Sequence, residues 1–446
     1  MEQIQLPEPM KIVLNRLEQY GFEAFVVGGC VRDALLHRPC SDWDVTTNAL
    51  PEEISEVFSE YPQADVGKQH GTVVVVIARE PIEITTYRIE GAYQDHRHPS
   101  SVSFTSSLEE DLARRDFTIN AMAYHPKTGI IDPFFGKRDL QKQQIRAVGQ
   151  AEQRFQEDAL RILRGLRFAA QLTFSIEEDT QTAMRNQQVL LDYLSKERIC
   201  AEVSKLLCAP NCVSVLRENA EIFFQILPEL RPMQGFQQNT PYHCFDVWEH
   251  TLHALEATPL DLILRLTMLL HDSGKPHTYV EDEKGVGHFP GHAKVSVQIA
   301  ETILSRLHFD KKTTERVCLL VTHHDLVMQQ EERWVKRQLN RFGEEVFFQL
   351  LTVHRSDAAG QSAICRPRFA EYDRCEAIAR EIIAQQQCFQ LRDLAVTGTD
   401  LIALGIPQGK QIGELLGLLL QNVMDGTCAN EKESLLALAE QLKETK

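Results

Sequence analysis

Apolar and polar positions change their period along this chain of 446 residues, and the change predicts where strands give way to helices. Residues 24–27 and 72–77 are short apolar runs typical of buried strands, and residues 82–87 alternate like a half-exposed strand. Helical patterns follow the first run and cover residues 51–58. The first part of the chain is therefore predicted to form a mixed α/β head.

After the head, apolar residues recur at helical spacing to the end of the chain, so the predicted fold class is α+β with an all-α remainder. Prolines, glutamines and a glycine interrupt the pattern near residues 227–240, which we interpret as a linker. We expect four parts: a head over 1–140, a helical neck over 141–226, a second domain over 241–360 and a helical tail over 361–446.

Composition is that of a folded protein, with 43% hydrophobic and 25% charged residues. No apolar run reaches the length of a membrane span and no secretory signal precedes residue 10, so we expect a cytoplasmic protein without a membrane partner. The 11 cysteines form no CxxC pair, which predicts free thiols. The oligomeric state is left open by the sequence.

Charge is unevenly distributed. The net charge is −16, yet residues 137–167 hold eight Lys or Arg against four Asp or Glu. A basic stretch in an acidic protein is typical of an RNA-binding surface, and a solvated helix exterior is the alternative.

Candidate phosphate-binding and metal-binding residues lie close together at residues 28–44. Gly28-Gly29 joins a predicted strand to a helix, so that backbone N–H groups can approach an anion such as a triphosphate. Asp42 and Asp44 lie two apart on an extended segment, and both carboxylates leave the same face and can hold hard cations. Glu83 is interpreted as a surface residue of its strand. A phosphate cradle beside a carboxylate pair indicates phosphoryl or nucleotidyl transfer.

Two later motifs add donors and acceptors suited to a nucleotide. In RRDFTIN, a guanidinium can bind phosphate while Asp116 accepts from a ribose hydroxyl. In EDALRILRGLR we predict one helix on which Asp158, Arg161, Arg164 and Arg167 recur every third residue. An Asp held beside an Arg resembles a base edge that pairs with cytosine and adenine; a simple ion pair is the alternative.

These motifs resemble the polymerase-β-like nucleotidyltransferases, and more closely the bacterial tRNA nucleotidyltransferase and poly(A) polymerase family, of which the class II CCA-adding enzymes are members. The resemblance implies template-independent, two-metal nucleotidyl transfer, with two Mg²⁺ ions on Asp42 and Asp44, CTP and ATP as substrates and tRNA as partner. It also implies that Asp158 and Arg161 read the base. The other nucleotide-binding residues that it implies are Gly28, Gly29, Arg32, Arg115, Asp116, Asn120, Arg164 and Arg167.

The polar segment 91–107 is interpreted as a mobile loop. In the family this loop accompanies addition of the terminal A, so its presence favours complete CCA addition. A-only addition or a poly(A) polymerase stays an alternative, as do a signalling nucleotidyltransferase of the uridylyltransferase type and a phosphohydrolase with a non-catalytic, RNA-binding head.

A second group of candidate residues recurs at the breaks between later helices. Imidazoles and carboxylates from separate helices can close around a metal and activate a bound water. Their order resembles the HD phosphohydrolase superfamily, which implies a divalent transition metal of unknown identity on His250, His271, Asp272 and Asp357. By the same resemblance Lys275 meets a phosphate. His292 with either His323 or His324 is expected to extend the site to two metals, and the sequence does not choose between the adjacent pair.

Overall fold

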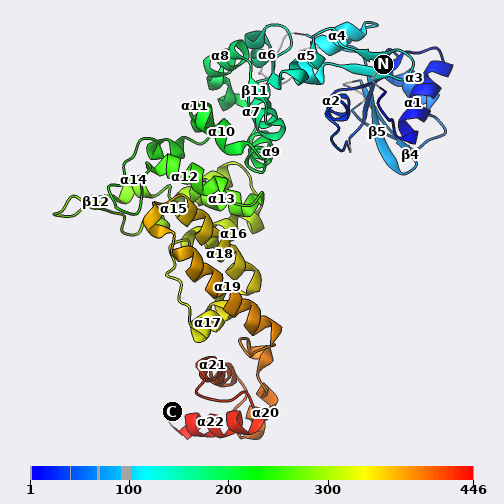
Figure 1. The fold of residues 1–446 in the computed structure, drawn as a ribbon. Coiled ribbons are helices and arrows are strands. Elements are labelled where there is room, and N and C mark those ends of the chain that lie inside the picture. Colours follow the sequence, from blue (N-terminus) through cyan, green and yellow to red (C-terminus); the bar gives the residue numbers. More distant parts are fainter. Residues whose placement is uncertain (1–2, 41, 68–70, 92–101, 445–446) are drawn as a thin grey trace. The chain divides into compact units, whose positions relative to one another are not determined.

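The computed structural model describes residues 3–40, 42–67, 71–91 and 102–444, which divide into two compact units (Figure 1). The first unit comprises Met1–Pro228 with Arg306–Phe309, and the second comprises Glu229–Ser305 with Asp310–Lys446. The finer division into head, neck, second domain and tail stays a prediction.

The first unit contains a seven-stranded mixed sheet with strand order β3-β4-β5-β2-β1-β8-β9. Strands β2 and β5 run parallel, and the other neighbours in the sheet are antiparallel. Helices α1 and α3 pack on this sheet (Figure 1). The strands are β1 (Ala24–Val27), β2 (Asp44–Thr47), β3 (Gln63–Gly67), β4 (Thr72–Ile77), β5 (Glu80–Thr86), β8 (Ala123–His125) and β9 (Gly129–Ile131).

Two small strand pairs accompany the main sheet. The parallel pair is β10 (Gln144–Ile145) with β11 (Ser175–Ile176), and the antiparallel pair is β6 (Arg88–Glu90) with β7 (Val102–Phe104). The segment expected to be a mobile loop, residues 91–107, falls largely on residues 92–101, which lie outside the described part. Its end is strand β7 rather than loop, because residues 102–104 pair with β6.

Short helices connect the strands, and longer ones complete the first unit. They are α1 (Glu8–Gln19), α2 (Gly29–Leu35), α3 (Pro51–Val57), α4 (Leu108–Ala113), α5 (Gly136–Gln141), α6 (Ala151–Glu157), α7 (Leu160–Leu172), α8 (Glu178–Asn186), α9 (Lys196–Leu207), α10 (Cys212–Glu218) and α11 (Ala220–Ile226), with 3₁₀ turns at Thr118–Asn120 and Gln188–Tyr193.

The predicted single helix through EDALRILRGLR is wrong at its start. Helix α6 ends at Glu157 and α7 begins at Leu160. Asp158 between them is extended, with φ −136° and ψ 104°, and its Oδ1 accepts a hydrogen bond from the Leu160 N–H at 3.1 Å. An Asp that binds the backbone two residues ahead competes with helix formation, which explains the break.

The second unit is helical apart from the hairpin β12 (Val280–Glu281) and β13 (Gly287–His288). A core that includes Leu339, Phe347, Leu351, Ile382 and Leu419 packs its later helices together. The helices are α12 (Val247–Glu256), α13 (Leu262–Leu270), α14 (Lys275–Thr278), α15 (His292–Arg306), α16 (Lys311–Thr322), α17 (Glu332–Phe342), α18 (Glu344–Ala359), α19 (Arg368–Ala384), α20 (Gly398–Ala403), α21 (Lys410–Met424) and α22 (Lys432–Glu444), with 3₁₀ turns at Pro228–Met233, Ala363–Cys365 and Leu391–Asp393.

The predicted fold class, a mixed α/β head followed by helices, is confirmed. Within the described residues no single helix has the length and apolar character to span a membrane, although the sharply bent pair α9 and α10, at 118°, meets that criterion jointly.

Candidate active site and candidate metal centre

A glycine turn opens the site of the first unit. Gly28 precedes α2 with φ +82°, a conformation that residues with a Cβ rarely adopt. A Cβ at Gly28 would lie only 3.0 Å from Nη1 of Arg115. The bare backbone and this guanidinium therefore lie side by side, and both offer N–H donors to an anion.

Carboxylates gather where β2 begins. In the sheet register Asp44 lies between Val27 on β1 and Glu83 on β5. Burial, and then the charges of Asp42 and Glu83, raise the pKa of Asp44 to about 6, while Arg115 acts in the opposite direction. Glu83 is exposed, as predicted, yet it lies close enough to contribute to this field. Crowded carboxylates of this kind favour a bound cation.

Arg32 lies on α2 one turn after the glycines, and it is buried. Its Nη1 donates to Oδ1 of Asn120 at 2.7 Å, and its Nε and Nη2 donate to the Asp33 carboxylate at 2.9 Å each. Asn120 in turn donates to Asp116 at 3.0 Å. The structure thus joins residues from the glycine turn and from RRDFTIN in one hydrogen-bonded set.

Asp116 is ionised within this set. Burial alone would raise the pKa of its carboxyl group, but the charge of Arg164 and hydrogen bonds from Asn120 and Arg164 lower it to about 2. Arg164 donates to Oδ2 of Asp116 through Nε at 2.8 Å and lies 2.6 Å from it through Nη2. Oδ1 of Asp116 also accepts from the Phe117 N–H at 2.8 Å, so both oxygens have protein donors in this structure.

The predicted base-reading residues are held by partners other than one another. Nη2 of Arg198, on α9, donates to both Asp158 oxygens at 2.8 and 3.1 Å. Arg161 donates to Glu157 at 2.7 Å and to the carbonyl oxygens of Arg154 and Arg114 at 3.1 and 2.8 Å. The alternative interpretation, a simple ion pair between Asp158 and Arg161, is not seen among the described residues, because Asp158 pairs with Arg198 on α9. Their role in reading the base stays a prediction.

Arg167 differs from the other residues predicted to bind the nucleotide. It is buried, and its guanidinium lies 2.5 Å from Glu202 and 2.8 Å from Gln171. Its cationic carbon also lies 4.1 Å from the centre of the Phe168 ring. These contacts bind α7 to α9, so packing explains Arg167 in this structure.

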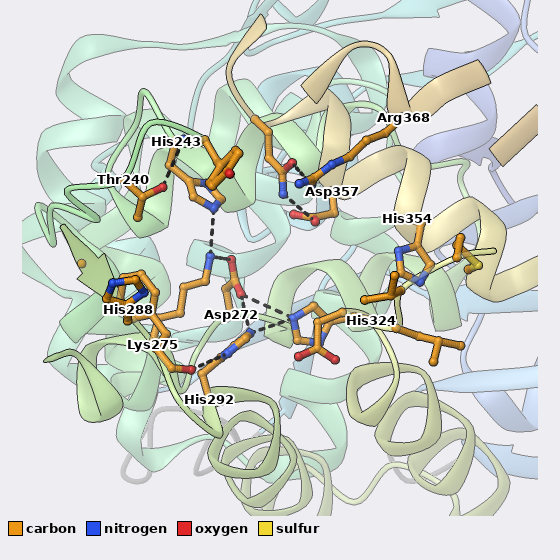
Figure 2. Close-up of a pocket in the computed structure, with 18 of the residues that line it drawn as sticks. Thr240, His243, Asp272, Lys275, His288, His292, His324, His354, Asp357 and Arg368 are labelled. Carbon is orange, nitrogen blue, oxygen red and sulfur yellow. Dashed lines mark hydrogen bonds and ion pairs between the residues drawn. The ribbon is translucent and has the colours of Figure 1, made fainter. Parts of the chain in front are cut away.

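The second unit holds an open cavity of about 470 Å³ (Figure 2). It is lined by the starts of α14 and α15, by α18 and α19, by β13, and by the segments after α13 and α16. Histidines and carboxylates line it. Lys275 lies on one side, and Arg368 and His354 lie on the other (Figure 2). The lining residues used below are Tyr242, His243, Asp272, Lys275, His292, Asp325, His324, His354, Asp357, Gln361, Arg368, Glu371 and Tyr372.

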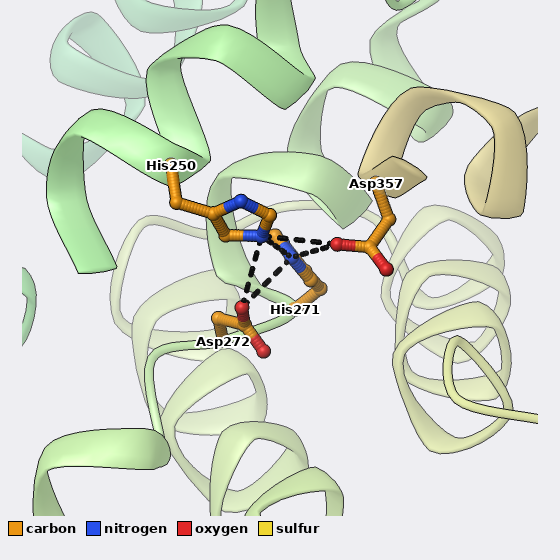
Figure 3. A group of neighbouring side chains, drawn as sticks. All are labelled: His250, His271, Asp272 and Asp357. Carbon is orange, nitrogen blue, oxygen red and sulfur yellow. Dashed lines mark hydrogen bonds and ion pairs between the residues drawn. The ribbon is translucent and has the colours of Figure 1, made fainter. Parts of the chain in front are cut away.

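Four predicted ligands converge beside this cavity (Figure 3). Nε2 of His250 lies 3.2 Å from Asp272 and 3.0 Å from Asp357, and Nε2 of His271 lies 3.2 and 3.5 Å from the same carboxylates. The helices explain the convergence: His271 and Asp272 directly follow α13, while Asp357 belongs to the last turn of α18 rather than to the segment after it.

A second group shares Asp272 and resolves the choice between the adjacent histidines. The other carboxylate oxygen of Asp272, Oδ1, lies 3.5 Å from His292 and 3.6 Å from His324, whose Nε2 atoms are 3.1 Å apart. His323 instead packs against Phe342 with ring centres 4.9 Å apart. His324 therefore belongs to the cluster, and Asp272 lies between two groups of nitrogens.

The histidines are oriented as metal ligands. Nδ1–H of His250 donates to the Gly360 carbonyl at 3.0 Å, and His271, His292 and His324 donate in the same way to the carbonyls of Met268, Phe289 and Val321. Each Nε2 lone pair is thereby directed to the cluster. Burial would lower the pKa of His271, yet Asp272 and Asp357 raise it to about 10. The donor set therefore fits a divalent cation.

Residues around these ligands were not anticipated from the sequence. Burial, and then the charge of Lys275, lower the pKa of His243 to about 3, and His354 lies buried one turn before Asp357. Spacing of three along one helix was a signal available for His354. No local signal marked His243, which lies in a loop, or Arg198, which lies 40 residues from its partner.

Three segments of the chain match profiles of known protein families. Residues 24–146 match the family profile described as "Poly A polymerase head domain", residues 173–233 match "Probable RNA and SrmB- binding site of polymerase A", and residues 289–439 match "tRNA nucleotidyltransferase domain 2 putative".

Relatives that match over nearly their whole length show which family the chain belongs to. The chain is 35% identical to the CCA-adding enzyme of Enterococcus faecalis over 96% of this chain and 94% of the relative, and 33% identical to that of Streptococcus thermophilus over 97% and 96%. The chain belongs to the CCA-adding enzyme family. Its fold is similar to the crystal structure of the Bacillus stearothermophilus CCA-adding enzyme in complex with CTP, with a TM-score of 0.73, 30% identity and 99% of both chains covered.

Family membership makes the chain a nucleotidyltransferase and implies the use of a divalent metal. The resemblance noted in the sequence is therefore confirmed at the level of the family. The individual residue roles and the second metal centre stay predictions.

Proposed function

We propose that this CCA-adding enzyme adds C, C and A to the 3′ end of tRNA, using CTP and ATP and no nucleic-acid template. The observation that supports it most is the meeting of the Gly28 turn, Arg115 and the Asp42, Asp44 and Glu83 carboxylates in one place. Relatives named for this activity match nearly the whole chain. The cytoplasm, where tRNA and nucleoside triphosphates occur, is the compartment that the activity implies.

Mg²⁺ is the divalent ion that fits Asp42 and Asp44, because Mg²⁺ prefers carboxylate oxygens together with substrate phosphates. When bound it would neutralise phosphate charge and favour ionisation of the tRNA 3′-hydroxyl. Around it Arg115 and the Gly28-Gly29 backbone bind the triphosphate, and Arg32 orients Asn120.

Recognition of the sugar and base uses the remaining residues. The family resemblance assigns Asp116 to the ribose hydroxyls, which would replace one of the protein donors that its oxygens have in this structure. Both oxygens of Asp158 and two nitrogens of Arg161 have protein partners. Each group keeps capacity for the base, since a carboxylate accepts up to about four hydrogen bonds and a guanidinium donates five. An acceptor and a donor held in this way fit the edges of cytosine and adenine.

Substitution of Asp42 tests the assignment. Asp42→Asn should lower the rate of tRNA extension by about 1,000-fold or more, because the carboxylate that binds the cation is lost. CTP binding measured without divalent ions should stay within about threefold. Asp179→Asn, on an exposed position of α8, is the matched control and should extend tRNA normally. Extension by Asp42→Asn near the wild-type rate would contradict the metal assignment.

A second activity is favoured by the cluster in the second unit. We propose that His250, His271, Asp272 and Asp357 hold one divalent transition metal, and that Asp272, His292 and His324 hold another, in an HD-type phosphohydrolase site. Such metals make water nucleophilic near neutral pH. In the hydrolysis, the oxygen of water bonds to phosphorus, the P–O ester bond breaks, and the ester oxygen leaves as a hydroxyl with one proton from the water.

Lys275 fits a role in this site. Its Nζ lies 2.6 Å from Oδ2 of Asp272 and donates to Gln238 at 2.8 Å. A cation fixed beside a metal-binding carboxylate is placed to bind a phosphate oxygen.

The second activity has its own test. Bound Mn²⁺ or Ni²⁺ is measured by elemental analysis, and hydrolysis is measured with bis(p-nitrophenyl) phosphate. Asp272→Asn should lose bound metal and reduce hydrolysis by about 100-fold or more, because Asp272 serves both groups. Glu315→Gln, at an exposed position of α16, should retain both. Unchanged metal content in Asp272→Asn would overturn the assignment.

A further inference from the structure

One wall of the cavity is not used by the metal ligands. It is formed by His354 from α18 and by Arg368 and Tyr372 from the first two turns of α19, and we call these three residues the α18–α19 wall. The wall lies across the cavity from Lys275 (Figure 2).

Arg368 has no carboxylate partner among the described residues. Nη1 donates to the neutral side chain of Gln361 at 2.9 Å, and the guanidinium carbon lies 5.6 Å from the centre of the Tyr242 ring. A guanidinium carries five donors, so most of them are left for a ligand. An uncompensated cation beside a cavity attracts an anionic group.

His354 adds a second donor. Only 5% of its surface is exposed, and its buried Nε2 has no hydrogen-bond partner among the described residues. Its ring centre lies 5.6 Å from that of Tyr372. Burial lowers the pKa of His354 to about 4, so the imidazole is neutral and offers one N–H. A buried polar atom without a partner is rare in folded proteins and is explained when a ligand or water completes it.

The wall is tied to the metal centre through a short chain of contacts. Gln361, which accepts from Arg368, donates through Nε2 to Oδ2 of Asp357 at 2.8 Å. Arg368 therefore lies one amide group beyond a metal-ligand carboxylate. The cavity volume of about 470 Å³ gives room for a ligand that reaches from the metal-ligand carboxylates to Arg368.

We propose that the α18–α19 wall binds a second phosphate of the substrate, so that the cavity takes a ribonucleotide with one phosphate on each side of a ribose. The inference rests on the proposed phosphohydrolase function. A free nucleoside bisphosphate and the terminal nucleotide of an RNA ending in a phosphate share this chemistry.

Further carboxylates in the cavity lining would favour a cationic ligand. Asp325 and Glu371 also line the cavity, so that four carboxylates stand against Lys275 and Arg368. Two divalent cations at the ligand groups would reverse this balance, and neither Asp325 nor Glu371 pairs with Arg368 in the described structure. An anion at Arg368 is therefore favoured once the metals are bound.

The experiment compares ligands that differ by one phosphate. Binding of adenosine 3′-monophosphate and adenosine 3′,5′-bisphosphate to the Mn²⁺-loaded full chain is measured by calorimetry, for wild type, Arg368→Gln and Arg366→Gln. Arg366 is the matched control, because it is exposed and does not line the cavity. The first unit is identical in all three proteins, so differences between them report on the wall.

Wild type and Arg366→Gln should bind the bisphosphate about tenfold tighter or more than the monophosphate, and Arg368→Gln should lose the preference, as expected for a charged hydrogen bond. Arg368→Lys, which keeps the charge, should retain part of it. An equal preference in wild type and Arg368→Gln, with both proteins folded by circular dichroism, would overturn the proposal.

Two further measurements, binding of a dinucleotide and hydrolysis of a model diester, identify the ligand class and test the phosphohydrolase separately. A dinucleotide ending in a 3′-phosphate that binds better than the bisphosphate assigns the site to an RNA end, and equal binding assigns it to free bisphosphates. Absence of bis(p-nitrophenyl) phosphate hydrolysis by wild type would contradict the phosphohydrolase itself, whereas hydrolysis without any bisphosphate preference would contradict only the wall.

Discussion

At the scale of single residues, the position of Asp158 decides how a base can be read. Both carboxylate oxygens are held by Arg198, which lies 40 residues away on α9. A single guanidinium nitrogen is shared by both oxygens, and Oδ1 also accepts from the Leu160 N–H at 3.1 Å. These contacts fix the carboxylate and leave Oδ2 with capacity for one further hydrogen bond. Arg198 is therefore expected to be a positioning residue for nucleotide selection.

Arg198→Gln should weaken discrimination between CTP and UTP by about tenfold, because an unfixed carboxylate can turn to accept from uracil. The measurement is kcat/KM for each nucleotide with a tRNA that lacks CCA. Lys205→Gln, exposed on the same helix, is the control and should keep the wild-type ratio. A folded Arg198→Gln enzyme with unchanged discrimination would show that Asp158 is fixed by other contacts.

The buried carboxylate of Asp44 should destabilise the metal-free protein when it is ionised. Its pKa is raised from 3.8 to about 6, mainly by burial, so its contribution to stability is present below about pH 4 and is lost as the pH rises through 6. Asp44→Asn in EDTA should therefore stabilise the protein at pH 8, by at most about 1–2 kcal/mol after allowance for partial exposure, and have little effect at pH 4. Thermal unfolding at both pH values measures this. A lower melting temperature at pH 8 would contradict the raised pKa.

At the scale of elements, the ends of helices position the second site. The sequence predicted histidines and carboxylates at helix breaks, since apolar runs mark helices well. It did not separate His323 from His324, because that choice depends on how α16 packs against its neighbours. The sequence also predicted one helix through Asp158, because the apolar period continues across the break. The hydrogen bond from the Leu160 N–H to Asp158 does not alter that period.

The end of α18 gives a test at this scale. A Cβ at Gly360 would lie 2.8 Å from the His250 carbonyl and 2.9 Å from Nδ1 of the same residue. Gly360→Ala should therefore displace His250 and weaken Mn²⁺ binding by about tenfold or more. Binding is measured by calorimetry on protein stripped of metal.

Gly417→Ala is the matched control, because its Cβ would meet nothing within 4 Å on the exposed side of α21. It should leave metal binding unchanged and add up to about 1 kcal/mol of stability from helix propensity. Equal metal affinity in the two alanine variants would show that α12 and α18 separate without moving the ligand.

At the scale of the whole molecule, the two candidate sites belong to different compact units. All predicted nucleotide-binding residues lie in the first unit, and both groups of metal ligands lie in the second. The sequence predicted both sets from local motifs. It could not predict Arg198, because Arg198 meets Asp158 across 40 residues of the chain. His354 carried a signal in its spacing from Asp357, but its unpartnered Nε2 depends on packing around it.

Separate sites should be separable by substitution. Asp272→Asn should abolish phosphodiester hydrolysis and leave tRNA extension in Mg²⁺ within about twofold of wild type. Asp42→Asn should do the reverse. Both activities are measured on the same preparations, and loss of both from either single substitution would contradict independent sites.

The most direct test of the central claim is extension of a tRNA that lacks its CCA end, with products resolved to one nucleotide. The proposed function predicts two added C residues with CTP alone and a complete CCA with CTP and ATP together. Addition of A alone, and only to a tRNA that already ends in CC, would contradict complete CCA addition. No extension under any condition would contradict nucleotidyl transfer to tRNA and leave the second site as the functional centre.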